Sequence, residues 1–159
     1  MSFLEGCARR VKQPSFVKII DSSILMMFTD TTIYRSLTIQ LETYMQMYKN
    51  MDKDYKMTIG KDVINLISDS ILFMSDSYLE QDKKTKLSFA TSALKKVSQC
   101  EIFCKALFDL KVLSPKQISA ISFNFGQIKS QLYRWIEKLR GNEANGVEAQ
   151  SLTNVDELI

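Results

Sequence analysis

Hydrophobic residues recur every three or four positions through most of the chain, which is the spacing of one face of an α-helix. The clearest run repeats without a miss at Ile118, Ile121, Phe125, Ile128, Leu132, Trp135 and Leu139. A stripe this regular is typical of a helix that packs against a hydrophobic core. It predicts that Trp135 lies in the core near one end of a bundle, with its indole N–H at the rim.

Three further helices are predicted by the same periodicity, at residues 31–50, 58–79 and 83–111. Four amphipathic helices with short connections pack most simply as an up-down-up-down four-helix bundle, so the predicted fold class is all-α. The bundle is expected to span residues 30–141, between an N-terminal arm at 1–29 and an acidic, disordered tail at 142–159. An alternative interpretation places the native start at Met26 or Met27, just before the bundle.

The ends of two helices are marked by residues that favour helix caps. Thr58 is expected to cap the exposed amides of the second helix. In the fourth helix Ser114 can cap, Pro115 takes the first helical position and Gln117 stands where the partner of a capping box belongs. Gly141 can adopt the left-handed conformation that ends helices, and we expect the fourth helix to end there.

Some apolar side chains fall outside the faces that are expected to form the core. Phe89, Ile102 and Phe103 lie well outside the core arc of the third helix. Phe123 lies nearly opposite the apolar stripe of the fourth. Because a helix that is apolar over most of its circumference is buried on more than one side, these four side chains predict an oligomer or partner interface. Scattered apolar residues on a surface are the alternative.

Charge is distributed unevenly along the chain, although the net charge is only +3. Between residues 81 and 140, twelve basic residues accompany four acidic ones. Such a surface, repeated around an oligomer, would attract phosphate groups and release counterions. The alternative is a lysine-rich face that only contacts solvent. The predicted nucleic-acid-binding residues are Lys95, Lys96, Lys105, Lys116, Lys129, Arg134 and Lys138.

The second helix has the opposite charge. Asp62, Asp69 and Asp76 recur every seven residues, and Glu80 extends the row. This acidic stripe is suited to a basic partner protein or a neighbouring subunit, and a solvated face is the alternative.

Several classes of chemistry are excluded by composition. The chain has no His, so neither a Ser–His or Cys–His nucleophile nor a His metal ligand can form. Cys100 and Cys104, one helical turn apart, are too few ligands for a structural zinc site and are expected to be small core residues. Glu101 falls near the core arc and is expected to have a basic partner or a local opening. We therefore expect a protein that is not an enzyme, with no catalytic residue, metal or cofactor.

The compartment is suggested by cysteine usage and hydropathy. Three Cys are an odd count, which disfavours a disulfide framework and fits the reducing cytoplasm. No stretch of about 18 uncharged apolar residues is present, so no membrane span is predicted.

Three segments resemble a known family: "DYKMTIGKDV" at 54–63, "LFDLKVLSPKQIS" at 107–119 and "QLYRWIEKLRG" at 131–141. Together they are similar to the Avd-type accessory proteins of diversity-generating retroelements, over about residues 32–141. The most specific parts are Tyr55-Lys56-x-Thr58-Ile59-Gly60, the Asp109-Leu110-Lys111 junction before Ser114, and the late Trp135. None of these is a catalytic signature.

The resemblance implies a small four-helix bundle that assembles into a ring-like homopentamer with a basic surface. Proteins of this family bind the reverse transcriptase of the retroelement together with RNA or DNA. They support the mutagenic copying of a template repeat into a variable gene, as scaffolds without chemistry of their own. The four-helix proteins encoded in intervening sequences of ribosomal RNA genes share the architecture. Their Asn-Ile-Ala-Glu-Gly-like segment is not seen here, which ranks this resemblance second. It implies the alternative function, a protein-binding bundle without nucleic-acid binding.

Overall fold

The computed structural model describes residues 22–151, with side chains described for residues 26–141, and no strand occurs within that range. The elements are α1 (Ser22–Thr29), α2 (Thr32–Lys49), α3 (Lys53–Tyr55), the π-helical turn η1 (Lys56–Gly60), α4 (Lys61–Leu79), α5 (Lys83–Asp109) and α6 (Pro115–Ser151). The predicted all-α class is therefore confirmed.

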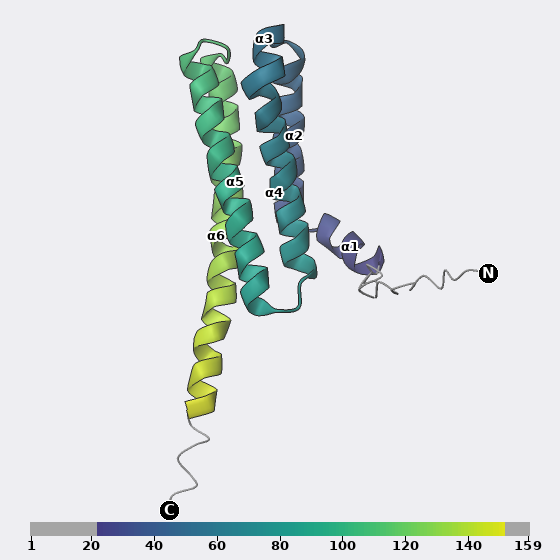
Figure 1. Ribbon diagram of the computed structural model, residues 1–159, viewed down its shortest axis with the longest axis vertical. Helices are drawn as coiled ribbons and strands as arrows, with labels where there is room; N and C mark the ends of the chain where they lie inside the picture. Colours follow the sequence, from purple (N-terminus) through teal and green to yellow (C-terminus); the bar gives the residue numbers. More distant parts are fainter. Residues whose placement is uncertain (1–21, 152–159) are drawn as a thin grey trace, which may run out of the picture.

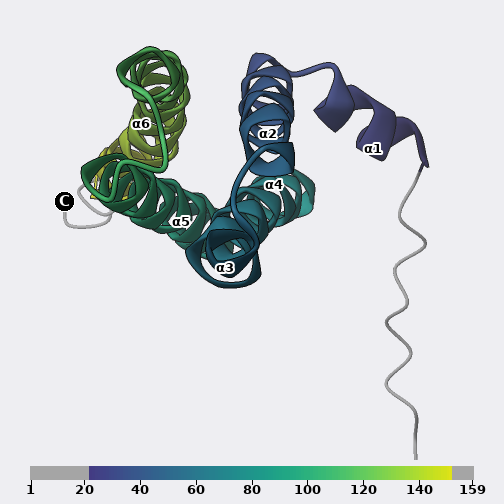
Figure 2. The same ribbon diagram turned by 90° about the horizontal axis from the view of Figure 1, so that it is seen from above.

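The four long helices run alternately up and down when they are followed through the colours of Figure 1. Seen from above in Figure 2, they stand at the corners of a square in the order α2, α4, α5, α6. Each packs against its two neighbours in that order, because α2 contacts α4 and α6, and α5 contacts the same two helices. This is the helical bundle of the predicted up-down-up-down order.

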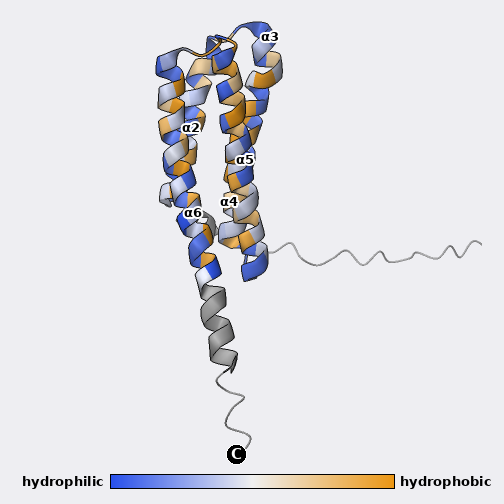
Figure 3. Ribbon diagram, turned by 90° about the vertical axis from the view of Figure 1, so that its left-hand side faces the viewer, coloured by the Kyte–Doolittle hydropathy of each residue, from blue (hydrophilic) through white to orange (hydrophobic). Residues whose placement is uncertain are grey.

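The core is formed by the facing sides of all four long helices. Figure 3 shows apolar and polar residues interspersed along each helix, as expected for helices with one buried face. The stripe predicted in α6 is confirmed, with Ile118 and Trp135 partly buried and the other members buried. The largest fully buried apolar side chains are Tyr44, Phe28, Phe125, Leu37, Ile67, Leu107, Ile121, Ile128 and Leu132.

Trp135 ties α6 to the end of α4. Its ring stacks on Tyr78 with the ring centres 6.4 Å apart. Its indole N–H donates a hydrogen bond to Ser77 Oγ at 3.2 Å, and that hydroxyl donates to the Lys86 carbonyl at 2.9 Å. The predicted core position is confirmed, and the indole N–H, which was expected at the rim of the bundle, is held there by the buried Ser77.

The start of α6 matches the predicted capping box. The amide of Ser114 donates to Gln117 Oε1 at 2.8 Å, and the amide of Gln117 donates to Ser114 Oγ at 3.2 Å. The predicted end at Gly141 is wrong, because α6 continues to Ser151 and no glycine among the described residues has a positive φ. Glycine permits the left-handed cap without requiring it, and the following Glu and Ala residues favour helix. Residues 142–151 of the expected tail thus extend α6, and residues 152–159 lie outside the described range.

The predicted cap at Thr58 is also wrong, because helical backbone begins earlier, at Lys53, and passes through η1 into α4. Thr58 itself has non-helical torsion angles, φ −115° and ψ −113°. Its hydroxyl donates to the Asp54 carbonyl at 2.8 Å, so it does not serve the amides of α4. A π-turn replaces the expected cap at this point.

The organised part of the chain begins before residue 30. Phe28, in α1, is 2% exposed and belongs to the core. Its ring meets Tyr34 edge-on, with the centres 5.4 Å apart. The last residues of the expected arm therefore form a helix that packs on the bundle, and residues 1–21 lie outside the described range.

Candidate nucleic-acid interface

The seven predicted basic residues divide into two groups according to their ion pairs. Lys96, Lys105 and Lys129 each pair with a carboxylate of the same chain. The other four have no ion pair with any residue that the structure describes, and each of them is exposed. An unpaired cation keeps its full charge for a ligand, whereas a paired one must first leave its partner, so the second group is the better candidate.

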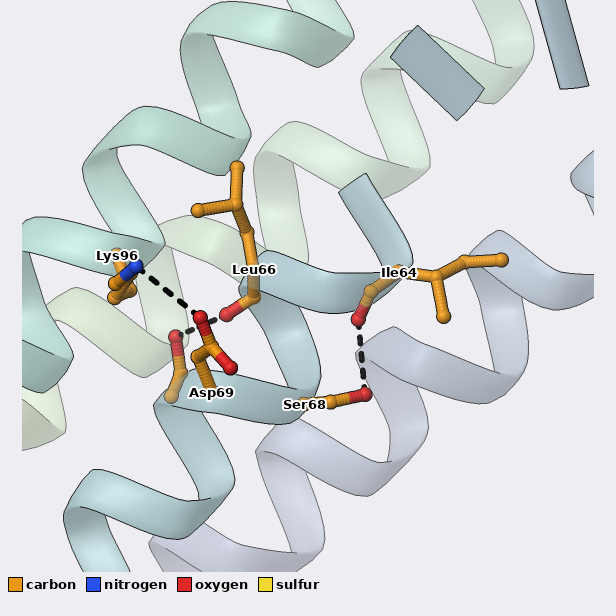
Figure 4. Close-up of polar contacts among 6 residues, drawn as sticks. Ile64, Leu66, Ser68, Asp69 and Lys96 are labelled. Carbon is orange, nitrogen blue, oxygen red and sulfur yellow. Dashed lines mark hydrogen bonds and ion pairs between the residues drawn. The ribbon is translucent and has the colours of Figure 1, made fainter. Parts of the chain in front are cut away.

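Lys96 extends from α5 to the neighbouring α4 and pairs with Asp69 at 3.1 Å, as Figure 4 shows. The contact takes up the middle carboxylate of the predicted acidic stripe. Asp62 and Asp76, the other two members, are exposed and have no ion pair with a described residue. The stripe is therefore interrupted at its centre by the helix beside it.

Glu101 has the basic partner that its position near the core requires. Lys129 of α6 pairs with Glu101 Oε2 at 2.6 Å, and both side chains are about one-third exposed. The pair joins α5 to α6 along one flank of the bundle. Lys105 pairs with Asp109 one turn away on α5 and lies over the ring of Phe108.

Three of the four unpaired residues share the outer face of α6. Lys116, Arg134 and Lys138 are separated by 18 and 4 residues. At 3.6 residues per turn they fall within about 40° of one another, on the side opposite the core. Lys95 lies on the outer side of α5, away from this row. We call Lys116, Arg134 and Lys138 the α6 basic face.

The electrostatics of the α6 basic face are positive. Between residues 115 and 141, Glu137 is the single acidic residue among five basic ones. Charges this far apart on a helix surface are screened individually, but a row of one sign still creates a field that attracts a polyanion.

The four apolar residues of the predicted interface also divide into two pairs. Phe89 is half-buried beside Phe73, with the ring centres 6.4 Å apart, and Phe103 packs partly against the core. Ile102 and Phe123 are 65% and 68% exposed. Ile102 lies on α5 and Phe123 on α6, so the two exposed side chains of the predicted interface belong to different helices.

A hollow between α2 and α6 adds residues that the sequence reasoning missed. It encloses about 200 Å³ and is lined by Ser36, Ile39, Phe123, Asn124 and Gln127. Ile39 is itself exposed, although it lies in the first amphipathic helix. Apolar residues outside the core-facing stripes of both helices were a signal in the sequence. Predicting that they line one hollow requires the register of α2 against α6.

Cys100 and Cys104 are free and fully buried, as predicted. A hydrogen bond with Cys104, together with burial, raises the pKa of the Cys100 thiol well above its ordinary value. A thiol held in its protonated form is a poor nucleophile. The pair therefore acts as small core side chains.

Within residues 22–151, no group of three or more His, Cys, Asp or Glu side chains could hold a metal ion. No described helix combines the length and the apolar character that crossing a membrane demands. Comparison with family models, with curated proteins and with solved structures found no match for this chain.

Proposed function

We propose that the chain is a non-enzymatic accessory protein of a diversity-generating retroelement, which binds the reverse transcriptase and its RNA or cDNA and supports mutagenic retrohoming. The observation that carries the proposal is the α6 basic face, three exposed cations without partners among the described residues. The resemblance of segments 54–63, 107–119 and 131–141 to the Avd-type family supports it independently.

The α6 basic face has the length to follow a nucleic-acid backbone. Lys116 and Lys138 are 22 residues apart, which is about 33 Å along a helix at 1.5 Å per residue. When these side chains contact phosphates, they displace the cations condensed on the nucleic acid. The release of those cations supplies most of the non-specific affinity. The expected contact is therefore with the backbone, without sequence preference at these three positions.

Assembly into a ring-like homo-oligomer, with five subunits as in the family, is the second part of the proposal. Ile102 is exposed on α5 beside a hollow that Leu66, Gln99 and Phe103 line, and an apolar side chain at such a groove is suited to a neighbouring subunit. Several copies would multiply the α6 basic face around one particle. A mass of one chain, 18.3 kDa, in light scattering would remove this part.

The test is a fluorescence-anisotropy titration of the purified chain with labelled RNA and DNA at low and moderate salt. We expect binding at low salt that weakens as salt rises, because the contacts are with phosphates. The same preparations are then tested for capture of a reverse transcriptase from a diversity-generating retroelement. A chain that binds neither nucleic acid nor the enzyme contradicts the proposal.

A protein-binding scaffold without nucleic-acid binding is the second candidate. The exposed and unpaired carboxylates of Asp62 and Asp76 on α4 favour it, since they present acidic charge to a basic partner. The titration separates the two candidates: capture of the enzyme without any binding of RNA or DNA at low salt fits the scaffold alone.

A further inference from the structure

The hollow between α2 and α6 has an exposed aromatic ring in its wall. Phe123 comes from α6 and Ile39 from α2, and both large side chains are more than half exposed. Gln131 Nε2 donates a hydrogen bond to Ser36 Oγ at 3.0 Å and holds the two helices together at one end of the hollow. A flat ring opposite an aliphatic side chain is a suitable wall for a planar, partly apolar ligand.

Exposed cations lie on the same helix faces as residues that line this hollow. Phe123 lies 7 residues after Lys116 and 11 before Arg134, both close to whole numbers of helical turns. Phe123 therefore belongs to the same side of α6 as the α6 basic face. On α2, Arg35 lies one turn before Ile39, is exposed and has no ion pair with a described residue.

Two amides of the hollow are available for hydrogen bonds. The side chains of Asn124 and Gln127 have no hydrogen-bond partner among the described residues. Each amide offers donors and an acceptor at once, which matches the polar edge of a nucleobase. None of the residues that line the hollow is acidic, and Glu42 lines a separate groove between the same two helices, together with Gln117.

We propose that this hollow binds an unpaired base of single-stranded nucleic acid, stacked on Phe123, while Arg35, Lys116 and Arg134 contact the flanking phosphates. The inference rests on the proposed nucleic-acid binding and names its class. Single-stranded ligands are favoured because the bases of a duplex stack on each other and cannot offer a face to the ring. A protein partner fits less well, because the two apolar side chains are few and lie among cations.

The test compares binding of a labelled oligothymidylate and a labelled duplex of equal length to the full chain and three variants. Phe123→Ala is expected to weaken single-strand binding by roughly ten-fold or more, the usual loss for one stacked base. Duplex binding and the salt dependence of both ligands should stay unchanged, since no phosphate contact is removed. Phe123→Trp keeps a stacking face and should retain the affinity.

Leu72→Ala is the matched control, because Leu72 is a similarly exposed apolar residue on α4 and should not affect either ligand. Circular dichroism and light scattering check that the variants keep their fold and subunit mass. Unchanged single-strand binding by Phe123→Ala, whatever the subunit mass of the variant, overturns the inference and leaves the proposed function intact. No binding of any nucleic acid by the unmodified chain overturns both.

Discussion

Gln40 is the most unusual single residue of the bundle. It is fully buried in α2, and neither its Nε2 nor its Oε1 has a hydrogen-bond partner among the described residues. The side-chain amide of Gln131 donates from Nε2 to Ser36 across the α2–α6 seam, but its Oε1 is buried and has no hydrogen-bond partner among the described residues either. A buried amide without partners loses its hydration without compensation, which costs about 1–3 kcal/mol.

Replacing Gln40 by leucine should therefore stabilise the protein. Gln40→Leu removes the buried amide at similar volume, and we expect the free energy of unfolding to rise by about 1–3 kcal/mol. Urea denaturation followed by circular dichroism measures the change. Gln46→Leu, at an exposed position of the same helix, serves as the control and should change little. A loss of stability in Gln40→Leu would show that the amide makes a favourable hydrogen bond.

At the scale of elements, the kinked passage from α3 through η1 into α4 is set by close packing on α2. The hydroxyls of Tyr44 and Tyr48 donate to the carbonyls of Gly60 and Lys56, at 3.2 and 3.3 Å. Burial raises the pKa of Tyr44 well above its ordinary value, so the hydroxyl stays a donor. A Cβ on Gly60 would lie 2.7 Å from the Tyr55 carbonyl oxygen, a position that only glycine tolerates.

Gly60→Ala is predicted to destabilise the protein by about 1–3 kcal/mol, the usual cost of overpacking a filled site. The backbone oxygen of Tyr55 cannot move away without disturbing η1. Gly126→Ala in α6 is the matched control, because nothing lies within 4 Å of its added Cβ. Alanine is the better helix former, so thermal unfolding should show a slight gain for Gly126→Ala. Equal melting temperatures for Gly60→Ala and the unmodified chain would contradict this account of the kink.

Features that depend on local sequence were predictable. The apolar stripe of α6 and its capping box at Ser114 follow from helical periodicity and from contacts within one turn. The kink at Thr58 was not, because it depends on side chains of α2 packing against Gly60. The continuation of α6 beyond Gly141 was missed because glycine permits two outcomes, which the residues after it decide.

The candidate site was predictable only as a set of basic residues. Sequence places Lys96 and Lys116 in the same group, but the pairing of Lys96 with Asp69 depends on how α4 and α5 are aligned. The same holds for Lys129 and Glu101 across α5 and α6, although a partner for Glu101 was expected. Neither the expected exposure of a lysine nor the helix that carries it shows whether the lysine forms an ion pair with a neighbouring helix.

At the scale of the whole molecule, the bundle presents different charges on different helices. The outer side of α4 carries Asp62 and Asp76, and that of α6 carries the α6 basic face. Since α4 and α6 stand at opposite corners of the square, a polyanion is attracted to one side of the bundle and repelled from the other. Under the proposed function, nucleic acid and a protein partner are therefore expected on opposite sides of the bundle.

The measurement that tests the central claim most directly compares two triple variants with equal losses of charge. The first, Lys116→Gln, Arg134→Gln and Lys138→Gln, removes the α6 basic face. The second, Lys96→Gln, Lys105→Gln and Lys129→Gln, removes three cations that are already paired.

Anisotropy titrations with single-stranded DNA over a range of salt give the slope of log affinity against log salt concentration. The first variant should bind weakly, with a slope reduced by about two, as expected for three lost phosphate contacts. The second should keep most of the affinity and of the slope. Equal losses in both variants would mean that only net charge matters, and a greater loss in the second would contradict the assignment of the α6 basic face.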